Sequence, residues 1–126
     1  MSATLMTKLQ LKPGQKLHLQ NAPKDVQAAL ARELPLVERG PADAVLLVVN
    51  NLEEARKQGA KMVKAAPKGS LMWVAYPKGT SKVKTDVNRD TLRGVFEALG
   101  WDTVRAVAID ETWSALRFRP TEEVGT

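Results

Sequence analysis

The chain has 126 residues, of which 44% are hydrophobic and 26% charged, a size and composition typical of one soluble globular domain. It contains no cysteine and a single histidine, His18, which excludes disulfides, thiolate metal sites and multi-histidine metal sites. The formal net charge is +5, and every charged residue between Arg56 and Thr85 is basic. Such a window attracts phosphates, nucleic acid or acidic partners, unless a helix face explains its lysines.

The first elements follow from the spacing of apolar residues near the N-terminus. A Pro-Gly pair precedes an alternating run in which Leu17 and Leu19 share one face, so residues 16–20 are predicted to form a strand. Proline at position 23 and the helical spacing that follows predict a helix over residues 23–33. Residues 36–38 are expected to form a short second strand.

The centre of the chain carries the clearest strand and the clearest helix. The sequence "ADAVLLVVN" is a continuous aliphatic run, which a strand buried on both faces requires. The next segment, "NLEEARKQGAKMVKAA", begins with a cap candidate in Asn50 or Asn51 and places glutamates before lysines, as the helix dipole favours. Its apolar residues share one side, and Lys57, Lys61 and Lys64 share the other. These three lysines therefore have a structural explanation.

The C-terminal half continues the alternation of strands and helices. The run "SLMWVAY" predicts a strand, and a helix is expected over residues 88–99, capped by Thr85 or Asn88 and stopped by Gly100. The run "TVRAVAIDETWSALRFR" predicts two strands around a tight connection at Asp110 and Glu111. Adjacent carboxylates in such a chain point to opposite faces, so they suit a turn better than acid–base catalysis.

This order of elements predicts an α/β fold. Crossovers through helices imply a three-layer, mainly parallel sheet, which the last two strands extend as an antiparallel C-terminal hairpin. We expect one Rossmann-like domain over residues 1–126, with residues 1–12 and 120–126 peripheral or flexible. No apolar run approaches the ~18 residues of a membrane span, and no signal peptide is recognisable at the start. A cytoplasmic location without membrane contact is therefore expected.

Two stretches resemble a shortened class I methyltransferase-like fold, which is a Rossmann-type sheet ending in an antiparallel hairpin. "LKPGQKLHLQNAP" looks like the opening strand of such domains, and "DETWSALRFRP" looks like their terminal strand pair. In addition, "LMWVAYPKGTSKVKTDVNRDTL" with "AIDETWSALRF" is similar to an uncharacterised bacterial family of small domains of unknown function. The resemblance spans residues 11–119 and implies a fold, but it brings no activity with it.

The turn after the first strand departs from the nucleotide-binding pattern. Such turns are glycine-rich because only glycine lets the backbone approach the ligand closely, whereas Gln20, Asn21, Ala22 and Pro23 stand here. Glu38 lies where an acid would meet a ribose, or else it is a surface acid near a turn. We therefore expect no cofactor, with S-adenosylmethionine disfavoured, and the absence of a catalytic constellation argues against an enzyme.

Ligands of open α/β sheets bind beyond the carboxyl ends of the strands, where the strand order reverses. Amino-methyltransferases place a catalytic Asn/Asp-Pro-Pro-aromatic motif at the equivalent of Asn50 and Asn51, but no proline or aromatic residue follows here, so a helix cap is favoured. Trp113 could cover the sheet edge or line a pocket, while Trp73 and His18 are expected to be structural. The candidate ligand-binding residues are Asn21, Glu38, Asn50, Asn51, Tyr76, Lys78, Thr80, Ser81, Lys82, Lys84 and Trp113.

Two functions remain open at this stage. The main hypothesis is a non-enzymatic Rossmann-like binding or interaction module, whose basic loop over residues 78–84 binds an anionic small molecule or a protein partner. The alternative is a small methyltransferase-like transferase with an altered S-adenosylmethionine site. Nucleic-acid binding is disfavoured because the basic window holds little arginine and the chain few aromatics. A homodimer is plausible because an open sheet leaves an edge.

Overall fold

The computed structural model describes residues 8–11, 14–32, 34, 36–37, 43–65, 71–77, 86–109 and 112–120. Its elements are β1 (Leu17–Gln20), α2 (Lys24–Ala31), β2 (Leu36–Val37), β3 (Ala44–Val48), α3 (Leu52–Ala65), β4 (Leu71–Pro77), α4 (Arg89–Glu97), β5 (Trp101–Ala108) and β6 (Trp113–Pro120). This order is the one predicted. None of the described helices is both long and apolar enough to cross a membrane.

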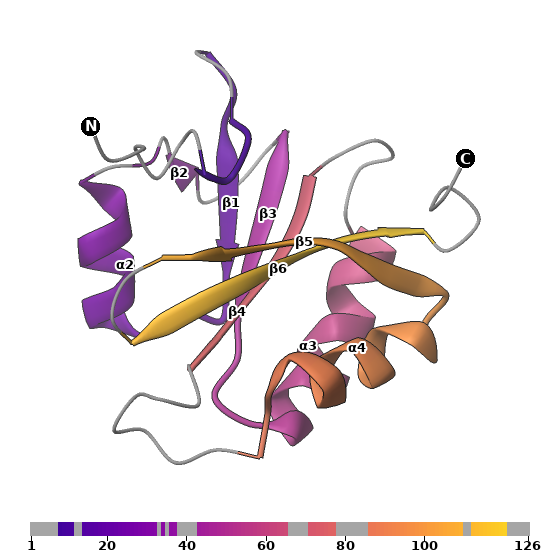
Figure 1. The fold of residues 1–126 in the computed structure, drawn as a ribbon. Helices are drawn as coiled ribbons and strands as arrows, with labels where there is room; N and C mark the ends of the chain where they lie inside the picture. The colour runs from indigo at the N-terminus through magenta and orange to yellow at the C-terminus, as the bar shows by residue number, and fades with distance from the viewer. Residues whose placement is uncertain are drawn as a thin grey trace.

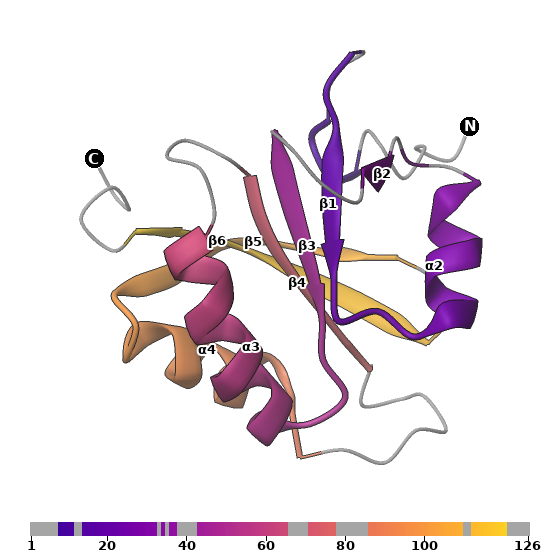
Figure 2. The ribbon, with the colours of Figure 1, turned by 180° about the vertical axis from the view of Figure 1, so that it is seen from behind.

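The six strands form one mixed sheet in the order β2-β1-β3-β4-β6-β5. Strands β2, β1, β3 and β4 are parallel, and β6 joins β4 and β5 in antiparallel pairs. In Figure 1, α2 lies on one side of this sheet and α3 and α4 on the other, and β5 and β6 cross β1 and β3 at a steep angle. Figure 2 shows the same arrangement from behind. The predicted α/β class and the antiparallel hairpin at one edge are confirmed.

The hydrophobic core is divided by the sheet into two clusters. Along β3, Leu46 and Val48 face α2 and the N-terminal segment, whereas Val45 and Leu47 face α3 and α4. Every residue of β3 is buried, because both faces of the strand are covered. The continuous aliphatic run in the sequence therefore forms a strand that is buried on both faces, as predicted.

The starts of α3 and α4 carry side-chain caps, as the sequence suggests. The side chain of Asn88 accepts a hydrogen bond from Thr91 N at 2.9 Å, and Asn88 N donates to Thr91 Oγ1 at 2.8 Å, which completes a capping box for α4. At α3, Asn51 Oδ1 accepts from Glu54 N at 2.9 Å. Gly100 ends the α4 region with φ +85°, a conformation that favours glycine.

Two boundaries differ from the expectation. The first helix begins at Lys24 and ends at Ala31, because Pro23 serves as an N-cap with extended backbone and without a side-chain hydrogen bond. In the N-terminal segment, which we expected to be peripheral, Leu9 and Leu11 are buried beneath the sheet with the α2 cluster. Trp73 Nε1 donates to Leu9 O at 3.1 Å, so this segment is tied to a central strand.

Two helical glycines have opposite surroundings and provide a matched test of core packing. A Cβ added to Gly59 in α3 would lie 2.9 Å from the ring of Phe96, which is itself fully buried and stacked on Phe118, whereas a Cβ at Gly94 in α4 would meet nothing within 4 Å. We expect Gly94→Ala to raise the free energy of unfolding by about 1 kcal/mol through helix propensity. Gly59→Ala is expected to lower it by about 1 kcal/mol, because overpacking outweighs that gain. Urea denaturation measures both, and equal shifts would contradict the packing argument.

Candidate functional site

The sheet order reverses between β1 and β3. From β1 the chain crosses to β2 on one side, and it then returns to the other side to form β3. The carboxyl ends of these two strands therefore form the topological switch point, where ligands of α/β sheets bind. Four polar side chains gather there, and we call them the switch-point cluster: Asn21, Asn50, Asn51 and Glu54.

Glu54 is the centre of the switch-point cluster. Its Oε1 accepts hydrogen bonds from Asn21 Nδ2 at 2.9 Å and from the backbone and side-chain nitrogens of Asn50 at 3.4 Å each, and its Oε2 accepts from Asn51 Nδ2 at 3.3 Å. Asn21 Nδ2 also donates to Val48 O at 2.9 Å. The side chains thus connect the end of β1, the end of β3 and the first turn of α3.

Sequence reasoning placed the three asparagines at this edge but assigned Glu54 only to the helix dipole. The signal that could have found it is the spacing Asn51-x-x-Glu54, because a cap residue followed three positions later by glutamate is a capping-box pattern. In this chain the glutamate side chain reaches across to β1 as well. That longer reach depends on the tertiary fold.

The turn after β1 keeps a glycine-like backbone without a glycine. Asn21 has φ +60°, in the left-handed region that glycine favours and that asparagine tolerates better than most residues. The absence of glycine was the main argument against a nucleotide-type turn. The backbone at Asn21 nevertheless adopts the left-handed conformation typical of glycine, and the Asn21 side chain adds hydrogen bonds to Val48 O and Glu54 Oε1.

A cavity of about 210 Å³ adjoins the switch-point cluster on the α2 face of the sheet. Val48 lines this cavity and also accepts the hydrogen bond from Asn21, so the two features share a wall. Of the two alternatives for Trp113, the structure supports lining a pocket. The remaining lining residues come from α2, β4 and the β5–β6 connection: Asp25, Val26, Leu30, Ala75, Ile109 and Thr112.

The other residues predicted to bind a ligand are either buried in the core or outside the described residues. The prediction that Tyr76 lies at the ligand rim is wrong. Its side chain is only 7% exposed and packs in the core beneath α3 and α4. The candidates Glu38, Lys78, Thr80, Ser81, Lys82 and Lys84, with the turn residues Asp110 and Glu111, lie outside the described residues.

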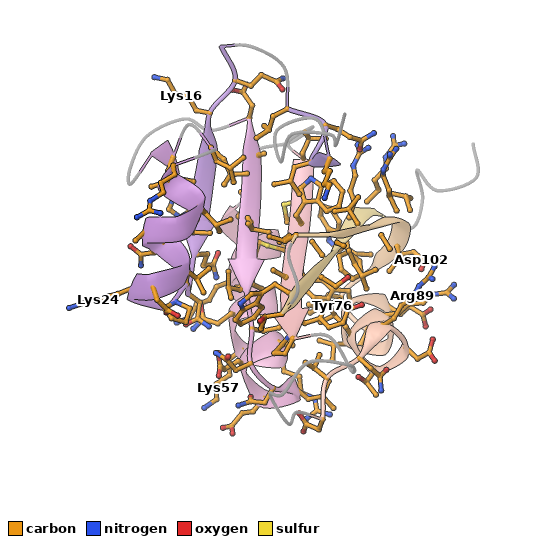
Figure 3. All side chains as sticks on the ribbon, turned by 60° about the vertical axis from the view of Figure 1, so that its left-hand side comes forward. Lys16, Lys24, Lys57, Tyr76, Arg89 and Asp102 are labelled. Carbon is orange, nitrogen blue, oxygen red and sulfur yellow. The ribbon has the colours of Figure 1, made fainter. Side chains whose placement is uncertain are left out.

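The helical lysines and the single histidine have no part in the switch-point cluster. Lys57, Lys61 and Lys64 are exposed on α3 as predicted, and Lys57 pairs with Glu53 at 3.0 Å. In Figure 3, Lys24 and Lys57 point away from the molecule near the end at which β3 terminates, and Lys16 lies at the opposite end. His18 is half-buried in β1. Within the described ranges, no three histidine, aspartate or glutamate side chains gather as metal ligands would.

Solved structures with the same fold are methyltransferases and related proteins. The M1A22 tRNA methyltransferase TrmK of B. subtilis matches with a TM-score of 0.56 and 8% identity over 94% of this chain. Magnesium protoporphyrin IX methyltransferase ChlM of Synechocystis with bound SAH matches with a TM-score of 0.53 and 10% identity over 82% of this chain. The DhpI–SAH complex matches with a TM-score of 0.54 and 14% identity over 92% of this chain. The chain spans 66%, 73% and 71% of those three proteins. No family model and no curated protein matches the sequence.

These matches correct two predictions. The non-enzymatic binding module was inferred from the localised basic charge and the missing catalytic residues, and the absence of a cofactor was inferred from the glycine-free turn. The chain instead has a methyltransferase-like Rossmann fold, and structures that share it were determined with SAM or SAH bound. At the level of the fold, the matches therefore favour the methyltransferase-like alternative over the non-enzymatic module.

Proposed function

We propose that this chain is a methyltransferase-like domain that binds S-adenosylmethionine at the carboxyl ends of β1 and β3. The observation that carries the proposal is the switch-point cluster, which gathers Asn21, Asn50, Asn51 and Glu54 where the fold places its ligand. The adjoining cavity supports it, because a transferase needs a second site beside the donor.

The chemistry of the cluster fits the amino-acid end of S-adenosylmethionine, which carries a carboxylate and an ammonium group. Pro23, the N-cap of α2, makes no side-chain cap hydrogen bond, and the helix dipole favours a carboxylate at this end, where the acidic Asp25 also stands in the first turn. The carboxylate of Glu54 and Oδ1 of Asn21 are acceptors suited to an ammonium group. When bound, the cofactor supplies a methyl group on a positively charged sulfur.

The residues of the chain have distinct roles in this proposal. Asn21 and Glu54 hold the donor, and the N-terminus of α2 orients its carboxylate. The cavity beside Val48 and Trp113 takes the methyl acceptor. Its volume is below the ~300 Å³ at which sites for complete drug-sized ligands begin, so it suits one group of an acceptor and not a whole adenosyl cofactor.

Titration with S-adenosylmethionine and S-adenosylhomocysteine tests the proposal directly. At a hundredfold excess over the dissociation constant, ligand binding should stabilise the protein by about 2.7 kcal/mol, which thermal unfolding detects and calorimetry confirms. Asn21→Ala should weaken binding about tenfold, because it removes the side-chain acceptor. Asn88→Ala is the control: it loses the cap of α4 at a cost of about 1 kcal/mol, yet it should retain full affinity. No stabilisation of the wild type at millimolar ligand would contradict the proposal.

A further inference from the structure

Three arginines gather on the C-terminal hairpin, away from the switch-point cluster. Arg117 and Arg119 alternate along β6 and therefore point to the same face. The pairing of Trp73 with Arg117 identifies this face as the one that the N-terminal segment and α2 cover. Arg105 of β5 pairs directly with Arg117. We call Arg105, Arg117 and Arg119 the hairpin arginines.

An irregularity in β5 creates this arrangement. Thr103 pairs with Phe118, but the next pair along the strands is Arg105 with Arg117, so Val104 is an extra residue in β5. Without that bulge, Val104 would oppose Arg117 and Arg105 would oppose Leu116 on the other face of the sheet. Like charges directly opposite each other destabilise a sheet. Bulges often change the direction of a side chain next to a functional site. The bulge thus builds a like-charge pair that simple pairing would avoid.

Arg117 is held in place and keeps one donor unused. Its Nη1 donates to Gln10 Oε1 at 2.6 Å, and Gln10 has φ +62°, a conformation uncommon outside glycine, between the buried Leu9 and Leu11. Its buried Nε has no hydrogen-bond partner among the described residues. Buried polar groups without a partner are rare in native proteins, so this unused donor needs a physical explanation.

The electrostatics of the cluster point in the same direction. Burial lowers the pKa of Arg117, and the positive charges of Arg119 and Arg105 lower it further. Asp102, the one acid within β5 and β6, lies opposite Arg119 across the strands, and its carboxylate accepts hydrogen bonds from Arg93 Nε at 2.9 Å and from Thr103 N at 2.8 Å. An anion beside the hairpin arginines would relieve their repulsion.

We propose that Arg105, Arg117 and Arg119 form a second binding site, which takes a phosphate group. Arginine presents a planar fork of donors that matches the oxygens of phosphate, and three arginines that the strand register places side by side suit a ligand with more than one negative charge. The phosphate belongs either to a small phosphorylated molecule or to a polynucleotide backbone. This inference does not depend on the proposed methyl-donor site, because it rests on different residues and a different part of the sheet.

Inorganic pyrophosphate is the probe, and the signal is the Nε–Hε resonance of Arg117 in a ¹H–¹⁵N NMR titration. The wild type should show a saturable shift of this resonance. Arg105→Gln should weaken binding about tenfold, because it removes one charged donor at an exposed position without disturbing the core. Arg56→Gln, which removes an exposed charge on α3 on the opposite face, is the control and should bind as the wild type does.

Two results would overturn the inference: no saturable shift in the wild type, or the same affinity in Arg105→Gln as in the wild type. Without ligand, Arg105→Gln should raise the melting temperature by about 2 °C, because it removes the repulsion across the strands. A lower melting temperature would refute that repulsion. A single-stranded oligoribonucleotide then identifies the source of the phosphate. If it competes with pyrophosphate and binds more tightly, the site takes a polynucleotide backbone; if it does not compete, the site takes a small phosphorylated molecule.

Discussion

Replacing Trp73 with alanine is expected to lower the free energy of unfolding by about 4 kcal/mol, the largest effect among the substitutions considered. Trp73 is fully buried at the centre of β4, where it packs between the strands and the N-terminal segment. Alanine would leave a cavity and would also remove the hydrogen bond from Nε1 to Leu9 O. Both losses act on the same structural unit, because that hydrogen bond holds Leu9 over the sheet.

Trp73→Phe separates the two contributions. Phenylalanine keeps an aromatic ring in the site but has no donor for Leu9 O, so a loss of about 1 to 2 kcal/mol is expected. Urea denaturation followed by circular dichroism measures both variants. If Trp73→Ala lost less than about 1.5 kcal/mol, the packing assigned to the N-terminal segment would be incorrect.

Replacing Glu54 with alanine should lower the free energy of unfolding by about 2 kcal/mol and weaken S-adenosylhomocysteine binding at least tenfold. The stability loss follows from the hydrogen bonds to Asn21, Asn50 and Asn51, which connect β1, β3 and α3 through one carboxylate. The loss of affinity follows from the proposed contact between this carboxylate and the ligand. Glu54→Gln should behave similarly, because its amide nitrogen would face the donors of the three asparagines.

Glu53→Ala is the matched control for Glu54. Glu53 is the preceding residue of the same helical turn, and its side chain forms an exposed ion pair with Lys57, in which 75% of the Glu53 side chain and 71% of the Lys57 side chain are accessible. Such a pair contributes little, so stability should change by less than about 0.5 kcal/mol and ligand affinity should not change. Equal effects of the two alanine variants would remove Glu54 from the site, whereas loss of stability alone would leave it a structural role only.

Most of the fold could be predicted from local patterns. The aliphatic run of β3, the cap at Asn88 and the lysine face of α3 each depend on residues a few positions apart, and each was found where the sequence indicated. The least accurate predictions concerned a boundary and a contact distant in sequence. Pro23 shortens α2, and Leu9 meets Trp73 across 64 positions of the chain.

The candidate site was only partly visible for the same reason. Asn21, Asn50 and Asn51 follow strand ends, and the rule that ligands bind at carboxyl edges placed them together. The sequence could not show that Asn21 takes a left-handed backbone conformation, so the missing glycine received too much weight. Tyr76 was misplaced because residues at a strand end are exposed or buried according to the helices that cover them.

The sequence by itself determined the α/β class, the order of elements, the switch-point asparagines and the helical explanation of three lysines, because periodicity and capping act within a few residues. Only the tertiary structure decided the central role of Glu54, the cavity beside Trp113 and the convergence of the hairpin arginines. The bulge at Val104 illustrates the physical reason. One inserted residue changes which side chains share a face of the sheet, and strand register is determined by pairing between distant segments and not by local sequence.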